Sequence, residues 1–200
     1  FGAVNRLRNA VLPAAQKKKI EELIKRSPSP ALARSHFTRL IEAGGLNSLR
    51  AVSEPELSLL IRVLGASSYL SEILIRHGKG WPVLFLRQIR ISQKPVAKHL
   101  ADLALSLSES NSLDDLCAVL RRHKQREYLR IGARDLLPNV TMEETVRELS
   151  ALAEAWLEAA YRFCRAEVEK DFGTLSLPGK QAGGRFVILS MGKLGGGELN

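Results

Sequence analysis

The sequence contains no long apolar run, few aromatic residues and only two cysteines among its 200 residues. No stretch approaches the roughly 20 apolar residues that a membrane-spanning helix needs, and the N-terminal residues lack the apolar block of a signal peptide. We therefore expect a soluble, cytoplasmic protein with no membrane partner. Cys117 and Cys164 have no Cys or His neighbour at metal-ligand spacing, so we expect two free thiols that are buried or half-buried.

The net charge of +9 favours an acidic protein or a nucleic acid as partner. Aromatic residues make up only 6% of the chain and are not interleaved with the basic ones. Stacking platforms for bases need that interleaving, so the charge favours a nucleic acid only weakly. The four histidines, which are scattered along the chain, are interpreted as structural: His36, His77, His99 and His123.

Helical periodicity extends from the start of the chain to about Phe172. Ser53-x-x-Glu56 and Thr141-x-x-Glu144 have the form of capping boxes and predict two helix starts. Behind the first box, four apolar residues predict an amphipathic helix: Leu57, Leu60, Ile61 and Leu64. A helix is also expected over 113–137, before Pro138. Behind the second box, apolar residues spaced by four and three predict a seam against another helix: Met142, Val146, Leu149, Ala153, Trp156, Ala160 and Phe163. These patterns predict a bundle-like helical domain over residues 1–172.

The pattern changes after residue 172. Glycines and Pro178 in residues 173–184 indicate a linker. The β-branched run Phe186–Ser190 then predicts a buried strand, the only convincing strand in the chain. Because one strand cannot form a sheet, we expect its sheet to lie beyond Asn200 and residues 185–200 to begin a second domain.

A glycine-rich turn, Gly192–Asn200, follows that strand directly. Turns of this kind bring backbone N–H groups close to phosphates, since a Cβ would block the approach. The spacing matches neither a Walker A loop nor the dinucleotide pattern, because Lys193 comes second and Leu194 follows it. On spacing alone, a phosphate cradle and a plain turn without ligand are equally supported.

Three stretches resemble the glutamine synthetase adenylyltransferase family. Gly192–Asn200 is similar to the opening of the family's nucleotidyltransferase motif, and Arg126–Leu136 is similar to a basic helical signature. Residues 144–153 resemble the helix that follows that signature. The family has two nucleotidyltransferase domains of the DNA polymerase β type: one attaches AMP from ATP to a tyrosine of glutamine synthetase, and the other removes it by phosphorolysis. This copy is similar to the removing half.

The resemblance implies a mainly α fold: a helical bundle-like domain followed by the first strand and glycine turn of a truncated α+β nucleotidyltransferase domain. It implies nucleotide binding by six residues: Gly192, Lys193, Gly195, Gly196, Glu198 and Asn200. The complete enzyme would use Mg²⁺ and ATP or ADP, with the metal on an Asp-x-Asp pair after Asn200. We therefore expect no catalytic or metal-binding residue, no bound cofactor and no activity in this chain alone.

A basic stripe steps by four along the predicted helix over 113–137: Arg122, Arg126, Arg130 and Arg134. It is either a surface for phosphates or an acidic partner, or a solvated face whose arginines pair with acids elsewhere in the bundle. We favour the structural interpretation. An alternative function for the helical domain is a regulatory module that docks glutamine synthetase or a PII-type signal protein. RNA binding, suggested by charge alone, ranks third.

Overall fold

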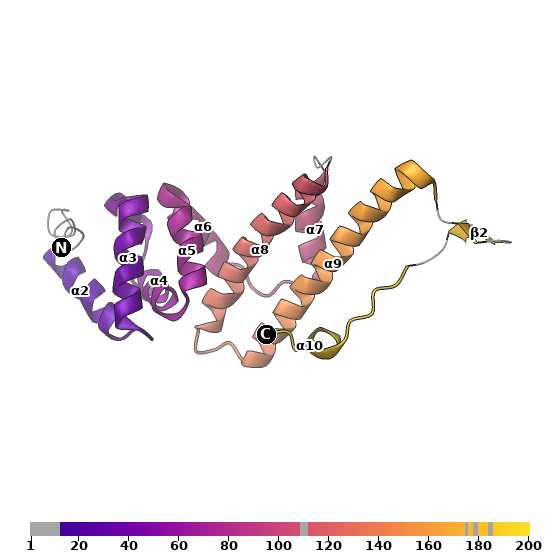
Figure 1. Cartoon of the computed structure of the whole chain (residues 1–200). Helices are drawn as coiled ribbons and strands as arrows, with labels where there is room; N and C mark the ends of the chain where they lie inside the picture. Colours follow the sequence, from indigo (N-terminus) through magenta and orange to yellow (C-terminus); the bar gives the residue numbers. More distant parts are fainter. Residues whose placement is uncertain (1–12, 109–111, 175, 178–179, 184–185) are drawn as a thin grey trace. The chain divides into compact units, whose positions relative to one another are not determined.

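The computed structural model describes residues 13–108, 112–174, 176–177, 180–183 and 186–200. It is mainly helical, as the sequence predicts (Figure 1). The chain divides into two compact units: a first unit of residues 1–92 and 125–140, and a second unit of residues 93–124 and 141–200. The boundary between the two units lies within the residues predicted as one helical domain, 1–172. The predicted linker at 173–184 and the second domain after it stay predictions.

The first unit is built from short helices: α2 (Ala14–Lys25), α3 (Pro30–Gly44), α4 (Glu54–Ala66), α5 (Ser68–Arg76) and α6 (Trp81–Ile89), with 3₁₀ turns η1 (Leu46–Ala51) and η2 (Gly78–Gly80). The part of α8 (Leu113–Asp135) from Gln125 onward also belongs to it. α3 packs on α4 and α5. Helices this short are marginal alone, so the shared core stabilises them.

The core of the first unit is apolar and well buried. On α4 the predicted apolar face is confirmed, since Leu57, Leu60, Ile61 and Leu64 are all buried. Trp81 is fully buried at the start of α6. Burying a leucine or isoleucine side chain of this core contributes about 1.5–3 kcal/mol. The Ser53–Glu56 capping box is present and begins α4 where the sequence predicts it.

The second unit contains α7 (Val96–Leu107), the first half of α8, and the long α9 (Met142–Phe172). The Thr141–Glu144 capping box begins α9, as predicted. The predicted seam along α9 is displaced, however. Met142 is 68% exposed, and the buried positions instead follow a neighbouring face: Glu148, Ser150, Leu152, Ala155 and Ala159. Leu103, Val119 and Ala159 form the small core, with Trp156 packed against it.

Both cysteines lie in helices of the second unit. They are free, as predicted, but Cys117 and Cys164 are exposed, so the expectation of burial is wrong. In each case the helix presents another face to its neighbours, which periodicity alone did not identify.

The stretch predicted as a linker contains two short strands. β1 (Ser176–Leu177) pairs antiparallel with β2 (Lys180–Gly183), a hairpin the sequence did not predict. Gly184 and Arg185 lie outside the described residues. Within 186–200, Phe186–Ser190 has no strand partner and its apolar side chains are exposed. Its assignment to a sheet beyond Asn200 stays a prediction.

No single helix in the described part of the chain is long and apolar enough to cross a membrane; α4 and α5 reach that composition only together, bent by 119° at their junction.

Candidate functional site

The glycine-rich turn is a single compact helical turn closed by its own backbone. α10 (Gly192–Gly195) follows Met191. The N–H of Gly196 donates to the carbonyl of Gly192 at 3.0 Å, and the N–H of Glu198 donates to the carbonyl of Lys193 at 2.7 Å. These bonds reverse the chain within seven residues, so the turn has a defined backbone before any ligand is considered.

Three of the glycines are required by this backbone. Gly192 and Gly197 have φ values of 62° and 70°, in the left-handed region that side chains disfavour. A Cβ on Gly195 would lie 2.6 Å from the carbonyl oxygen of Ser190, which is too close.

Gly196 differs from these three. Its φ is −81°, an ordinary helical value. A Cβ there would lie 3.6 Å from the carbonyl oxygen of Gly192, which is normal van der Waals contact. The fold of the turn therefore does not explain a glycine at position 196.

The polar side chains of the turn are exposed to solvent. The Lys193 ammonium donates to the side-chain oxygen of Asn200 at 2.5 Å, and no ion pair joins it to an acid within the described residues. Glu198 is exposed. The six predicted nucleotide-binding residues thus lie on one short segment, in which the Lys193 ammonium has no ion-pair partner among the described residues.

Ser150 attaches this turn to α9. Its hydroxyl donates to the carbonyl of Val146 at 2.8 Å and accepts from the N–H of Leu199 at 3.0 Å. Ser150 is buried. No sequence pattern predicts this role, because a serine in the middle of a helix gives no signal that it holds a segment 49 residues away.

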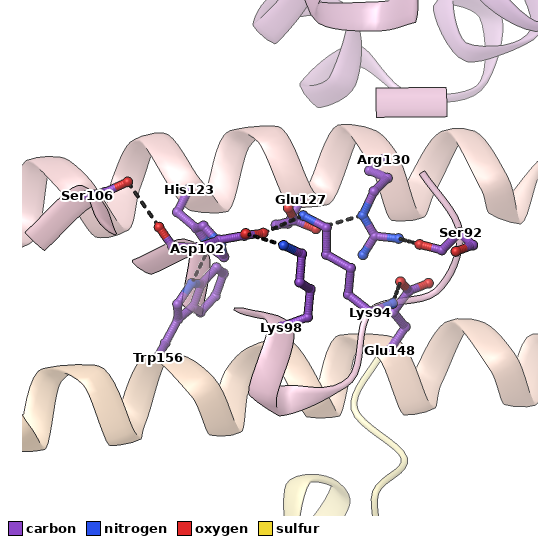
Figure 2. Close-up of polar contacts among 10 residues, drawn as sticks. All are labelled: Ser92, Lys94, Lys98, Asp102, Ser106, His123, Glu127, Arg130, Glu148 and Trp156. Atoms are coloured by element: carbon purple, nitrogen blue, oxygen red, sulfur yellow. Dashed lines mark hydrogen bonds and ion pairs between the residues drawn. The ribbon is translucent and has the colours of Figure 1, made fainter. Parts of the chain in front are cut away.

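The entry to α7 is held to α9 by a neighbouring set of charges (Figure 2). The backbone N–H of Lys94 donates to the carboxylate of Glu148 at 3.0 Å. The Lys94 ammonium lies 3.0 Å from Asp102, and that of Lys98 lies 3.1 Å from it. Burial raises the pKa of Asp102, but the hydrogen bonds from the two lysines outweigh burial and hold the pKa below its usual value. These contacts position α7 and α9 in the second unit.

Two of the histidines that the sequence shows as scattered come together in the second unit. His99 and His123 are buried with their rings edge to face, 5.6 Å apart. The indole N–H of Trp156 donates to Nδ1 of His123 at 3.0 Å (Figure 2). Because an indole N–H only donates, Nδ1 of His123 carries no proton here. The ring pair connects α7, α8 and α9, which agrees with a structural role.

The predicted basic stripe on α8 is not a continuous exposed surface. Arg130 is fully buried in the first unit, where its Nε donates to Glu127 at 2.7 Å and its Nη1 to the carbonyl of Ser92 at 3.2 Å (Figure 2). Arg122 and Arg126 are exposed, and Arg134 is half-buried. Arg130 therefore braces α8 against the loop after α6 rather than facing solvent.

A family model described as glutamate-ammonia ligase adenylyltransferase matches residues 57–200. Three similar proteins carry the name bifunctional glutamine synthetase adenylyltransferase/adenylyl-removing enzyme. Over 70% of the present chain, the sequence is 35% identical to the protein from Shewanella woodyi. Over 88% of the present chain, it is 33% identical to the protein from Shewanella oneidensis. It is 31% identical to that from Streptomyces coelicolor over 90%.

The chain spans only about a sixth of the length of these relatives, covering 14%, 18% and 17% of them. No solved structure gave a significant match.

Proposed function

Because the chain belongs to the glutamate-ammonia ligase adenylyltransferase family, we propose that it supplies the helical region and the opening of one nucleotidyltransferase site in an enzyme that regulates glutamine synthetase. The half we assign is the adenylyl-removing one, which transfers AMP from a tyrosine to phosphate and releases ADP. The resemblance of Gly192–Asn200 to the family motif supports this assignment.

The observation that best supports nucleotide binding is the glycine at position 196, which the backbone of the turn does not require. The turn does not need a glycine there, because a side chain would meet only ordinary contacts. A phosphate that approaches the backbone closely would need a glycine there, because a Cβ would block its approach. The N–H groups of Gly196 and Glu198 already bond within the turn, so a phosphate would contact N–H groups earlier in it.

Lys193 adds the charge that such a ligand requires. Its ammonium bonds to the neutral amide of Asn200 and not to an acid within the described residues. When a phosphate binds, Lys193 can exchange this contact for a hydrogen bond to a phosphate oxygen, which adds the attraction of opposite charges that the neutral amide lacks.

The residues of the turn do not form a magnesium site. Glu198 is the only carboxylate in Gly192–Asn200, and the side-chain oxygen of Asn200 already accepts from the Lys193 ammonium. A divalent cation held there would face that positive charge. The 200 residues contain no Asp-x-Asp pair. We therefore propose that this chain alone does not catalyse the transfer.

ADP binding tests the proposal. We expect ADP to shift the backbone amide NMR signals of Gly192–Asn200, and Gly196→Ala to weaken that binding without changing the melting temperature. Lys193→Gln should weaken it as well, whereas Lys170→Gln, a change of an exposed lysine in α9, should not.

Amide shifts that miss the turn, or equal ADP affinity in the Gly196→Ala chain, would refute nucleotide binding here. Release of ADP from adenylylated glutamine synthetase by the chain alone would refute its inactivity.

A second role, docking of an acidic protein surface by the first unit, is supported by the distribution of charge. The first unit has 18 Lys and Arg against 8 Asp and Glu, while the second has 12 against 13. The whole excess of positive charge thus belongs to the first unit, which suits an acidic patch on glutamine synthetase or a PII-type signal protein. Salt-sensitive capture of glutamine synthetase would support this role. Binding of arbitrary RNA with the same salt dependence would favour a nucleic acid instead.

A further inference from the structure

The first unit has a hollow of about 550 Å³ that the proposed function does not use. It is lined by residues of α5 and the helix end behind it, with one residue of α8: Ser68, Tyr69, Glu72, Ile73, Arg76, His77 and Gln125. Its volume lies within the range of about 300–1,000 Å³ that small-molecule sites occupy.

One wall of the hollow is aromatic and apolar. Tyr69 leaves 48% of its surface exposed, although a ring of that size usually packs inside. Its ring is held edge to face against Tyr128, with centroids 6.0 Å apart and planes at 67°. Ile73 lies beside it in the lining. The hollow thus offers an oriented ring to the apolar part of a ligand.

The lining of the hollow carries one arginine and one glutamate, and the two have different partners. Arg76 is exposed, and the described residues provide no ion-pair partner for it. The only acid in the lining, Glu72, bonds to Arg39 at 2.5 Å. That hydrogen bond holds the pKa of Glu72 below its usual value. The Glu72 carboxylate is therefore hydrogen-bonded from outside the hollow and also attracts the Arg76 guanidinium through space, but no ion pair within the described residues engages Arg76.

Other hydrogen-bonding groups converge on the same place. His77 uses Nδ1–H to donate to the carbonyl of Ile73 at 2.9 Å, which orients the ring and leaves its other nitrogen unused by that bond. The hydroxyls of Ser68 and Tyr69 and the amide of Gln125 add donors.

We propose that this hollow binds a small organic anion, with a carboxylate or phosphate group on Arg76 and an apolar or aromatic body against Tyr69. The excess positive charge of the first unit raises the local concentration of such anions. The site is separate from the glycine turn, which belongs to the second unit, and its ligand is an effector rather than the transferred nucleotide.

Three probes of matched size test the proposal: phenyl phosphate, benzoate and the neutral benzyl alcohol. Titration of the ¹⁵N-labelled chain should shift the backbone amide signals of residues 68–77 with both anions and much less with benzyl alcohol. Arg76→Gln should weaken anion binding about fivefold, the effect expected from a solvent-exposed charge contact, and leave benzyl alcohol unchanged. Tyr69→Ala should weaken all three. The ratio of phenyl phosphate to benzoate affinity shows which anionic group the hollow prefers.

Lys79→Gln is the matched control, since Lys79 is an exposed cation close in sequence that does not line the hollow. It should leave all three affinities unchanged. Because Arg76 and Tyr69 are exposed, both variants should fold, which circular dichroism checks. Equal affinity for benzyl alcohol and the anions, or equal effects of Arg76→Gln and Lys79→Gln, would overturn the proposal. Gly196→Ala should change ADP binding only, so failure of either proposal leaves the other standing.

Discussion

The hydroxyl of Ser150 accepts a hydrogen bond of 3.0 Å from the backbone N–H of Leu199, 49 residues further along the chain. Through this bond α9 holds the end of the glycine turn. The same stretch of α9 holds the entry to α7, because Glu148 accepts from the N–H of Lys94. A helix whose sequence predicts only packing thus positions two other segments of the second unit.

Ser150→Ala should loosen the glycine turn. The Leu199 N–H loses its acceptor, and a hydrogen bond of this kind contributes about 1 kcal/mol. Hydrogen exchange at Leu199 should therefore become about fivefold faster. Ser106→Ala removes a comparable hydroxyl, which donates to the carbonyl of Asp102 on the exposed side of α7, and should leave Leu199 unaffected. Unchanged exchange at Leu199 in the Ser150→Ala chain would show that this bond does not hold the turn.

Arg130→Met should destabilise the chain far more than Arg126→Met, one helical turn earlier. Arg130 is fully buried, and its loss removes the 2.7 Å partner of the Glu127 carboxylate, which is itself only 3% exposed. Breaking such a pair costs about 3–5 kcal/mol, whereas a change at the exposed Arg126 should stay within about 0.5 kcal/mol. Urea unfolding measures both.

Adding Glu127→Leu to Arg130→Met separates the cost of breaking the Arg130–Glu127 pair from the loss of packing. The double variant should recover part of the stability, since it also removes the buried carboxylate that has lost Arg130. If Arg126→Met and Arg130→Met cost the same, the buried pair does not stabilise the first unit.

The Glu56 capping box should make the stability of the first unit depend on acid. The Glu56 carboxylate accepts from the hydroxyl and the N–H of Ser53 at 2.7 Å and 2.8 Å. The hydrogen bond from the Ser53 side chain, followed by that from its backbone, lowers the pKa of Glu56 from 4.5. A lowered folded-state pKa stabilises the fold above the unfolded value, and this contribution disappears as pH falls through the folded value.

The free energy of unfolding should therefore decrease below about pH 4.5. Glu56→Gln should reduce this decrease and cost stability near neutral pH. Glu42→Gln, at an exposed position of α3 outside the capping box, is the control and should leave the free energy of unfolding near neutral pH unchanged. An identical pH profile for the Glu56→Gln chain would contradict the role of the box.

Both cysteines should react with a thiol reagent in the folded chain. Cys117 and Cys164 are free and exposed, so Ellman's reagent should modify two thiols per chain without denaturant, at rates that urea changes little. Cys117→Ser and Cys164→Ser should each remove one reactive thiol. A thiol that reacts only after unfolding would show that its helix face is covered.

Local signals in the sequence predicted the helices well. Both capping boxes begin helices at the predicted residues, because a cap depends on a side chain and a backbone group three residues apart. The apolar face of α4 was also predicted correctly, since its four leucine and isoleucine positions repeat with the period of a helix.

Faces that carry both small and polar residues were predicted less well. On α9 the buried face includes Glu148 and Ser150, which periodicity counts as polar. Their burial depends on partners 49 and 54 residues away in sequence, Leu199 and Lys94. Arg130 was placed in a stripe with Arg126 because spacing describes only their helix, while its acceptor at Ser92 lies outside it.

The sequence by itself determined the family, the helical character of the chain and the place of the glycine turn, because these depend on residue order and short-range spacing. Only the tertiary structure decided which helix face is covered, which arginine is buried and which glycine the backbone does not require. The first two depend on atoms brought together from distant parts of the chain, as the bond between Ser150 and Leu199 also does. The third depends on the path of the backbone through the turn, which leaves room for a Cβ on Gly196.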